Sequence, residues 1–75
     1  MDPIKTGAVI RSQRQMKGMT QLELAEKLCV SDKTVSKWEC GGGAPDISLL
    51  PALARVLDVD VKALLYGGLQ ERGSS

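Results

Sequence analysis

The sequence predicts an all-α fold, a compact domain of five short helices. Three observations lead to this prediction: apolar residues recur at intervals of three and four, glycines and prolines divide the chain into short segments, and no segment reads convincingly as a strand. A chain of 75 residues is near the lower size limit for unaided folding, so nearly every apolar residue has to enter one core. The expected core residues are Ile10, Leu24, Ala25, Leu28, Val30, Val35, Trp38, Leu50, Leu53, Ala54, Leu57 and Leu64.

The first expected helix ends before Gly18, and the second begins at Thr20. The segment TQLE fits a capping box, in which the Thr20 hydroxyl accepts from the amide of Glu23 and the Glu23 carboxylate accepts from the amide of Thr20. This second helix is expected to end near Leu28. Ser31 has the side chain of an N-cap for the third helix.

The third helix is expected over about residues 31–39, with Asp32 in its first turn placed favourably against the helix dipole. The corner before it is only a few residues long. For two helices to meet so tightly, the first needs a small side chain, and the turn and the second helix need apolar ones. Ala25, Val30 and Val35 meet this requirement in order.

The fourth and fifth helices follow the loop GGGAPD. Asp46 or Ser48 can cap the fourth helix, and Pro51 is tolerable there because it falls near the first turn. The fifth helix is short and ends at Gly67. No internal repeat is expected. Residues 1–67 are therefore predicted to form the domain, and residues 68–75 a polar tail or the start of a linker.

Composition excludes several classes of function. The formal charge is +1 and the pI is near 7.8, so bulk charge does not favour nucleic acid, a membrane or an acidic substrate. Cys29 and Cys40 are the only cysteines and histidine is absent, which removes the usual zinc spacings and the commonest general base. We therefore expect no enzyme activity, no metal and no cofactor. The N-terminal segment lacks the apolar run of a signal peptide or membrane span, so a cytoplasmic protein with reduced thiols is expected.

The corner carries a longer motif. The pattern TQxxLAxxxxVSxxxVxxWE, from Thr20 to Glu39, resembles the helix-turn-helix domains of the lambda and Cro repressors. The likeness extends from about Ile10 to Gly67 through IRSQRQMKGMTQ and LLPALARVLDVDVKALLYG, and so covers roughly three quarters of the chain. The resemblance implies a lambda-repressor-like fold of the XRE type, a prokaryotic or phage regulator that binds a double-stranded DNA operator. Its third helix would lie in the major groove.

The resemblance also implies roles for individual residues. The positions expected to read base edges are Asp32, Lys33, Thr34, Ser36 and Lys37. Gln21 matches a residue that binds a backbone phosphate and braces the reading side chains. Arg14 and Glu39 match a buried or half-buried structural salt bridge. Arg11 and Lys17 can touch phosphates or can simply keep the first helix soluble.

Several of these roles have a plainer alternative. Lys33 and Lys37 lie four residues apart, as charges do on any solvated helix face. Asp32 can be a dipole partner only, since a carboxylate near phosphate is repelled. Trp38 can suggest base stacking, but its spacing from Val35 favours the core.

Charge placement and two departures from the family pattern bear on affinity. Residues 5–39 hold seven lysines and arginines against four acidic residues, whereas residues 40–75 hold three against four, so the half with the motif is the basic half. Cys29 stands where the family usually has a glycine with a positive φ, and about 1 kcal/mol of strain is expected there. The loop GGGAPD after Cys40 lacks basic residues, so one copy is expected to bind weakly. For the two cysteines, either a thiol switch or a semi-buried packing role is open.

Domains of this kind usually act as homodimers on two half-sites about one helical turn apart. The expected dimer surface contains Leu64, Leu65, Tyr66 and Leu69. The rival reading is a protein-interaction module of the same fold, of the antitoxin or anti-repressor type, with an unknown protein partner. Repression is the expected action, but the residues do not separate it from activation. They also leave open the operator sequence, the inducing signal, and whether the chain is complete or is the first domain of a longer protein.

Overall fold

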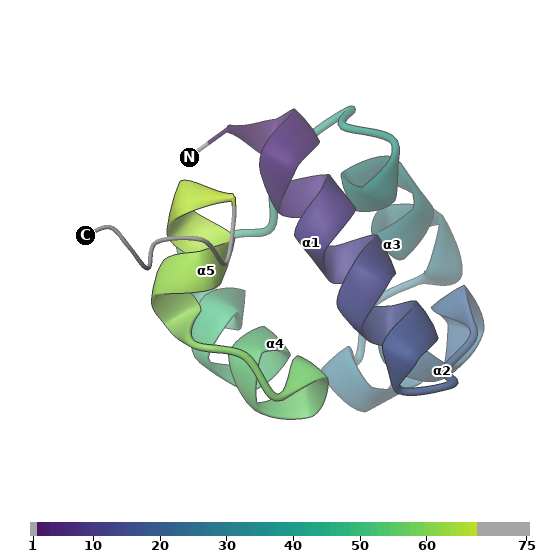
Figure 1. The fold of residues 1–75 in the computed structure, drawn as a ribbon. Coiled ribbons are helices and arrows are strands. Elements are labelled where there is room, and N and C mark those ends of the chain that lie inside the picture. Colours follow the sequence, from purple (N-terminus) through teal and green to yellow (C-terminus); the bar gives the residue numbers. More distant parts are fainter. Residues whose placement is uncertain (1, 68–75) are drawn as a thin grey trace.

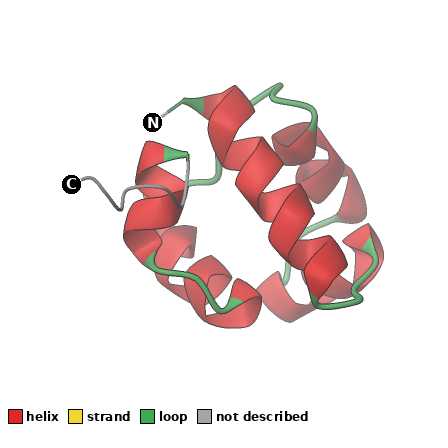
Figure 2. Cartoon of the chain, in the orientation of Figure 1, coloured by secondary structure: helices red, strands yellow, loops and turns green. Residues whose placement is uncertain are grey.

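The computed structural model describes residues 2–67, and every regular element in this part of the chain is helical (Figures 1 and 2). No helix in it is long and apolar enough to span a bilayer. Leu69 and the rest of the predicted tail, residues 68–75, lie outside the described residues. The elements in order are α1 (Pro3–Met16), α2 (Gln21–Leu28), α3 (Asp32–Glu39), the 3-10 turn η1 (Ile47–Leu49), α4 (Leu50–Leu57) and α5 (Val61–Tyr66).

Helix α1 forms the centre of the arrangement. It packs against α3 on one side and α5 on the other, while α2 and α4 close the lower part of the view in Figure 1. The helix begins where Asp2 accepts hydrogen bonds from the amides of Ile4 and Lys5, at 2.9 and 3.3 Å. Pro3 occupies the first turn, where its missing amide has no intrahelical partner to lose.

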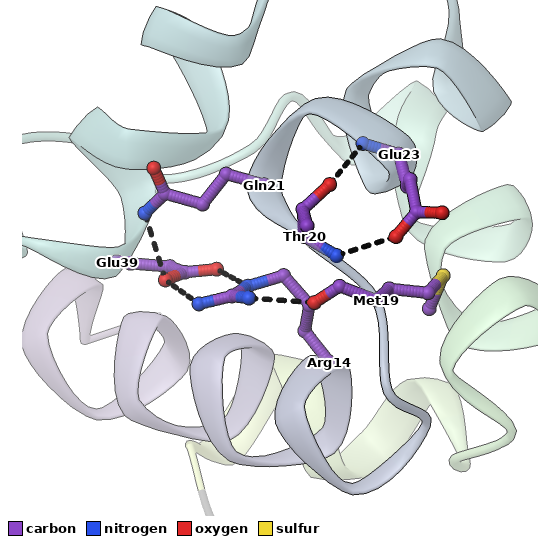
Figure 3. Close-up of polar contacts among 6 residues, drawn as sticks. All are labelled: Arg14, Met19, Thr20, Gln21, Glu23 and Glu39. Carbon is purple, nitrogen blue, oxygen red and sulfur yellow. Dashed lines mark hydrogen bonds and ion pairs between the residues drawn. The ribbon is translucent and has the colours of Figure 1, made fainter.

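The predicted starts of α2 and α3 are confirmed. Thr20 Oγ1 accepts from the amide of Glu23 at 3.0 Å, and the Glu23 carboxylate accepts from the amide of Thr20 at 2.8 Å (Figure 3). Ser31 Oγ accepts from the amide of Thr34 at 3.1 Å and caps α3. Between the helices, Cys29 has a φ of 60° and a ψ of 39°, so the left-handed conformation expected of a glycine is kept by a residue with a side chain.

The start of α4 differs from the prediction. Asp46 accepts from the amide of Ser48 at 3.1 Å, but this bond caps η1 and not α4. The residue before α4 is Leu49, which makes no side-chain capping bond. The chain therefore enters α4 directly from a 3-10 turn. Carbonyl groups of this turn can accept hydrogen bonds from the first amides of α4, which a capping side chain would otherwise do.

The α4–α5 corner resembles the α2–α3 corner locally, because both begin with a helix that ends in a left-handed residue. Asp58 has a φ of 59° and a ψ of 47°, and Cys29 has a φ of 60° and a ψ of 39°, so both are left-handed. After each of them, a valine amide donates over 3.0 Å to an alanine carbonyl: Val30 to Ala25, and Val59 to Ala54. The matching segments are LAEKLCVSDK, which begins at Leu24, and LARVLDVDVK, which begins at Leu53.

The core is mostly aliphatic, with Trp38 among its members, and it is continuous through all five helices. All of the expected core residues are buried except Val30, which is half-buried and packs against the others. The buried set also contains Thr6, whose hydroxyl donates to the carbonyl of Leu64 over 2.7 Å and so fastens α1 to α5. Gly7 brings α1 against α3, because a β-carbon at this position would lie 2.0 Å from the carbonyl oxygen of Trp38. Helix α3 is thus held against α1 at backbone distance.

Candidate nucleic-acid interface

Helix α3 has one face in the core and one face in solvent. Val35 and Trp38 are 0% and 5% exposed and anchor the inner face. Asp32, Lys33 and Lys37 are exposed. Burial of Trp38 removes the base-stacking alternative, because the indole has no face open to a ligand. The outer face therefore presents one carboxylate near its start and two ammonium groups one turn apart.

The two hydroxyl side chains of α3 are less available than the lysines. Thr34 is half-buried, and its hydroxyl shares a hydrogen bond with Ser31 Oγ at 2.8 Å. The hydroxyl of Thr34 is thus committed to the cap of its own helix. Ser36 is also half-buried. Of the five residues expected to read bases, Asp32, Lys33 and Lys37 are the ones the fold leaves exposed.

A polar network ties the end of α3 to α1 and α2 (Figure 3). Arg14 donates from Nε to Glu39 Oε2 at 2.6 Å and from Nη2 to Oε1 at 3.0 Å. Its Nη1 donates to the carbonyl of Met19 at 2.7 Å. The two side chains are 11% and 3% exposed, so the pair is largely withdrawn from water. A bidentate pair of this geometry fixes the relative positions of the two helices more than a single contact would.

Gln21 completes the network. Its Nε2 donates to Glu39 Oε1 at 3.1 Å, so its amide braces the buried carboxylate and not a reading side chain. The carbonyl of Met19 and the Gln21–Glu39 contact were not found by sequence reasoning. A backbone acceptor leaves no mark in the side-chain pattern, and no spacing rule joins positions this far apart.

The electrostatics keep Arg14 inside the network. Its hydrogen bond with Glu39 raises the pKa of Arg14 above its ordinary value, and the opposing effect of burial is smaller. The guanidinium is therefore always charged, and its positive charge is balanced by Glu39. The contacts of Arg14 therefore join α1 to the end of α3 and to the chain at Met19.

The two proposed phosphate contacts, Arg11 in α1 and Lys17 at its C-cap, have different surroundings. Arg11 is exposed. Lys17 Nζ lies 3.4 Å from Asp58 Oδ2, and both side chains remain solvated, at 42% and 82% exposure. An exposed pair of this kind is weak, so Lys17 can still exchange Asp58 for another anion. The Asp58 partner was not predicted, because it lies in the distant α4–α5 corner.

The expected dimer surface is only partly available. Leu64 is 0% exposed and belongs to the core, so its assignment to that surface is wrong. Leu65 is half-buried, and Tyr66 is 72% exposed. Ile47, in η1, is similarly exposed at 73%.

Both cysteines are exposed, so the semi-buried packing role, one of the two alternatives for Cys29 and Cys40, is wrong. They are free thiols. The residues from 2 to 67 contain no group of three or more His, Cys, Asp or Glu side chains that could hold a metal ion.

Known proteins share this fold and motif. A helix-turn-helix family model matches residues 10–64. The chain is 33% identical over 71 residues to an endothelial differentiation-related factor 1 homolog from Xenopus laevis, a match that covers 95% of this chain and 48% of that protein. It is 38% identical over 58 residues to the HTH-type transcriptional activator BcrR from Enterococcus faecalis, covering 77% of this chain and 28% of that protein. The chain thus spans less than half of the length of either relative.

A solved structure shares the fold. The clp gene regulator ClgR from Corynebacterium glutamicum superposes with a TM-score of 0.79 at 33% identity, covering 89% of this chain and 71% of that chain. The family match includes α2, α3 and the corner between them, and the superposition extends over most of the chain. The chain therefore belongs to the lambda and Cro repressor-like helix-turn-helix family.

Proposed function

We propose that the chain is a sequence-specific regulator of transcription that places α3 in the major groove of double-stranded DNA. The observation that carries the proposal is the outer face of α3. This face presents Lys33 and Lys37 to solvent, while Val35, Trp38 and the Glu39 network hold the inner face in place. A helix fixed in this way can meet base edges without losing its own packing.

In this proposal the first turn of α3 reads sequence. Lys33 donates to O6 and N7 of a guanine, and Asp32 accepts from N4 of a cytosine. Ser36 contributes where its half-buried hydroxyl reaches the groove. The backbone amide of Gln21, at the start of α2, faces a phosphate, and Arg11 and Lys17 extend this contact along α1. Thr34 keeps its hydroxyl in the hydrogen bond with Ser31. It then contributes to DNA reading only by fixing the start of α3.

We propose further that the protein acts as a homodimer on two half-sites, because one recognition helix reads too few base pairs for selectivity. Leu65 and Tyr66 of α5 are the remaining described candidates for the dimer surface. A dimer that covers an operator obstructs transcription, so repression is the proposed action. The proposed location is the cytoplasm, at the nucleoid, and the proposed role is not enzymatic.

The experiment that tests the function is selection from random duplex DNA with the purified protein, followed by the same selection with Lys33→Ala. Lys62→Ala is the matched control, because Lys62 is an exposed lysine of α5 at the position that aligns with Lys33. We expect a palindromic consensus that loses definition in Lys33→Ala and is unchanged in Lys62→Ala. Failure to enrich any sequence at low salt would refute DNA reading and would favour the protein-interaction module, whose apolar contacts respond little to salt.

A further inference from the structure

Helix α3 is followed by three consecutive glycines, Gly41 to Gly43. Gly41 has a φ of +77°. Its amide donates to the carbonyl of Trp38 at 3.0 Å, and the amide of Gly42 donates to the carbonyl of Lys37 at 2.9 Å. This is the hydrogen-bond pattern of a Schellman motif, in which a side chain at the second position after the helix normally packs on the side chain five residues earlier. Gly42 has no side chain to make that contact.

The stem of Lys37 occupies the vacant place. A β-carbon on Gly42 would lie 3.3 Å from Lys37 Cγ, and one on Gly43 would lie 3.2 Å from Cε and 3.8 Å from Nζ. The lysine side chain therefore runs along the two glycines and ends beside Gly43. A lysine stem covers backbone surface in this way while its ammonium group stays in water. We call Gly42 and Gly43 the glycine ledge.

The glycine ledge distinguishes the two lysines of α3. The atoms nearest to the ledge belong to Lys37, and none of them belongs to Lys33. The ammonium of Lys37 is consequently drawn to the C-terminal end of α3, away from the first turn that would meet base edges. Among the described residues Lys37 forms no ion pair, so its charge is free for an anion. The loop GGGAPD itself supplies no cation.

We propose that Gly42 and Gly43 are positioning residues that direct Lys37 to a DNA phosphate beside the loop, while Lys33 reads bases. This inference rests on the proposed DNA-binding function and assigns different work to the two exposed lysines of its recognition helix. Lys37 then provides the phosphate-neutralising charge that the loop sequence lacks.

The test is a double-mutant cycle with the full chain, measured as affinity against salt for two duplexes. One duplex carries the consensus recovered by selection, and the other carries the same bases in scrambled order. Lys37→Ala should lower affinity for both duplexes by a similar factor, about fivefold to tenfold near 0.1 M salt, and should reduce the salt slope by about 0.9. Lys33→Ala should instead change the ratio between the duplexes.

Gly43→Ala tests the ledge itself. Neither ledge glycine has a positive φ, so alanine is compatible with the backbone there and perturbs only the Lys37 stem. We expect Gly43→Ala to weaken binding to both duplexes in the native background and to have no further effect in the Lys37→Ala background. Thermal unfolding of both variants should match the native protein.

Two results would overturn the inference while DNA binding stands: a Lys37→Ala variant that changes the duplex ratio without changing the salt slope, or a Gly43→Ala effect of equal size in both backgrounds. A native chain that binds neither duplex in a salt-dependent way would instead refute the proposed function, and the inference with it.

Discussion

Gly7 of α1 lies against the backbone of Trp38 in α3, so closely that a β-carbon on Gly7 would be 2.0 Å from the Trp38 carbonyl oxygen. Two helices approach to this distance only where one of them lacks a side chain. Glycine normally costs about 1 kcal/mol in a helix interior relative to alanine. At this position the close contact outweighs that cost, because it brings α3 onto the core.

Gly7→Ala should therefore destabilise the protein although it raises helix propensity. We expect a loss of about 2–3 kcal/mol in the free energy of unfolding, in the range of overpacked interiors, measured by urea denaturation. The control is Ala8→Gly at the next, exposed position, which should cost about 1 kcal/mol from propensity alone. If the Gly7→Ala variant is as stable as the native protein, α1 and α3 can move apart without a loss in the free energy of unfolding, and the close contact is not needed.

Removing the Arg14 side chain should leave the carboxylate of Glu39 buried with Gln21 as its remaining side-chain donor. Arg14→Ala should lower the free energy of unfolding by about 3–5 kcal/mol, as expected when one partner of a buried pair is lost. Lys17→Ala breaks the exposed pair with Asp58 and should cost less than about 1 kcal/mol. Equal losses in the two variants, measured in the same denaturation series, would contradict the structural role of Arg14.

Cys29 and Asp58 hold the same left-handed conformation in the two corners, so they can be compared directly. Cys29→Gly should raise stability by about 0.5–1 kcal/mol, because a glycine has no β-carbon to strain at a positive φ. Asp58→Gly should gain less, since aspartate tolerates this conformation better than most residues and Asp58 also contacts Lys17. Thermal unfolding of both variants shows which substitution raises stability more. A larger gain from Asp58→Gly would refute the strain argument.

Hydrogen bonds from the Ser48 side chain and amide hold the pKa of Asp46 below its ordinary value. A carboxyl whose pKa is depressed by folding stabilises the folded state above its unfolded pKa. That contribution is lost as the pH falls through the lower, folded pKa. Ser48→Ala should shift the pKa of Asp46 upward, as followed by carboxyl chemical shift in an NMR titration. The backbone bond remains in this variant, so the shift should be partial, and an unchanged titration would show that the hydroxyl contributes nothing.

Local signals carried most of the fold prediction. The capping box at Thr20 and Glu23 and the cap at Ser31 involve residues three apart, and their hydrogen bonds follow from sequence alone. Asp46 was predicted as a cap but for the wrong helix, because residue type alone does not distinguish a 3-10 turn from the first turn of an α-helix.

Contacts between distant segments were harder to predict. The bracing of Glu39 by Gln21 and the pairing of Lys17 with Asp58 depend on how the helices cross, which side-chain spacing does not encode. The likeness of the two corners is confined to a few positions. They share four apolar residues and one exposed lysine, Lys33 in the first and Lys62 in the second.

The network of Arg14, Gln21 and Glu39 also has a thermodynamic consequence. It joins three helices by hydrogen bonds that are present in the free protein, so α3 is already ordered before any ligand arrives. Association on this face then carries little conformational entropy loss. The heat-capacity change of binding should be the value expected from the surface buried at the interface alone. It should lack the additional negative change that is seen when a segment folds on binding.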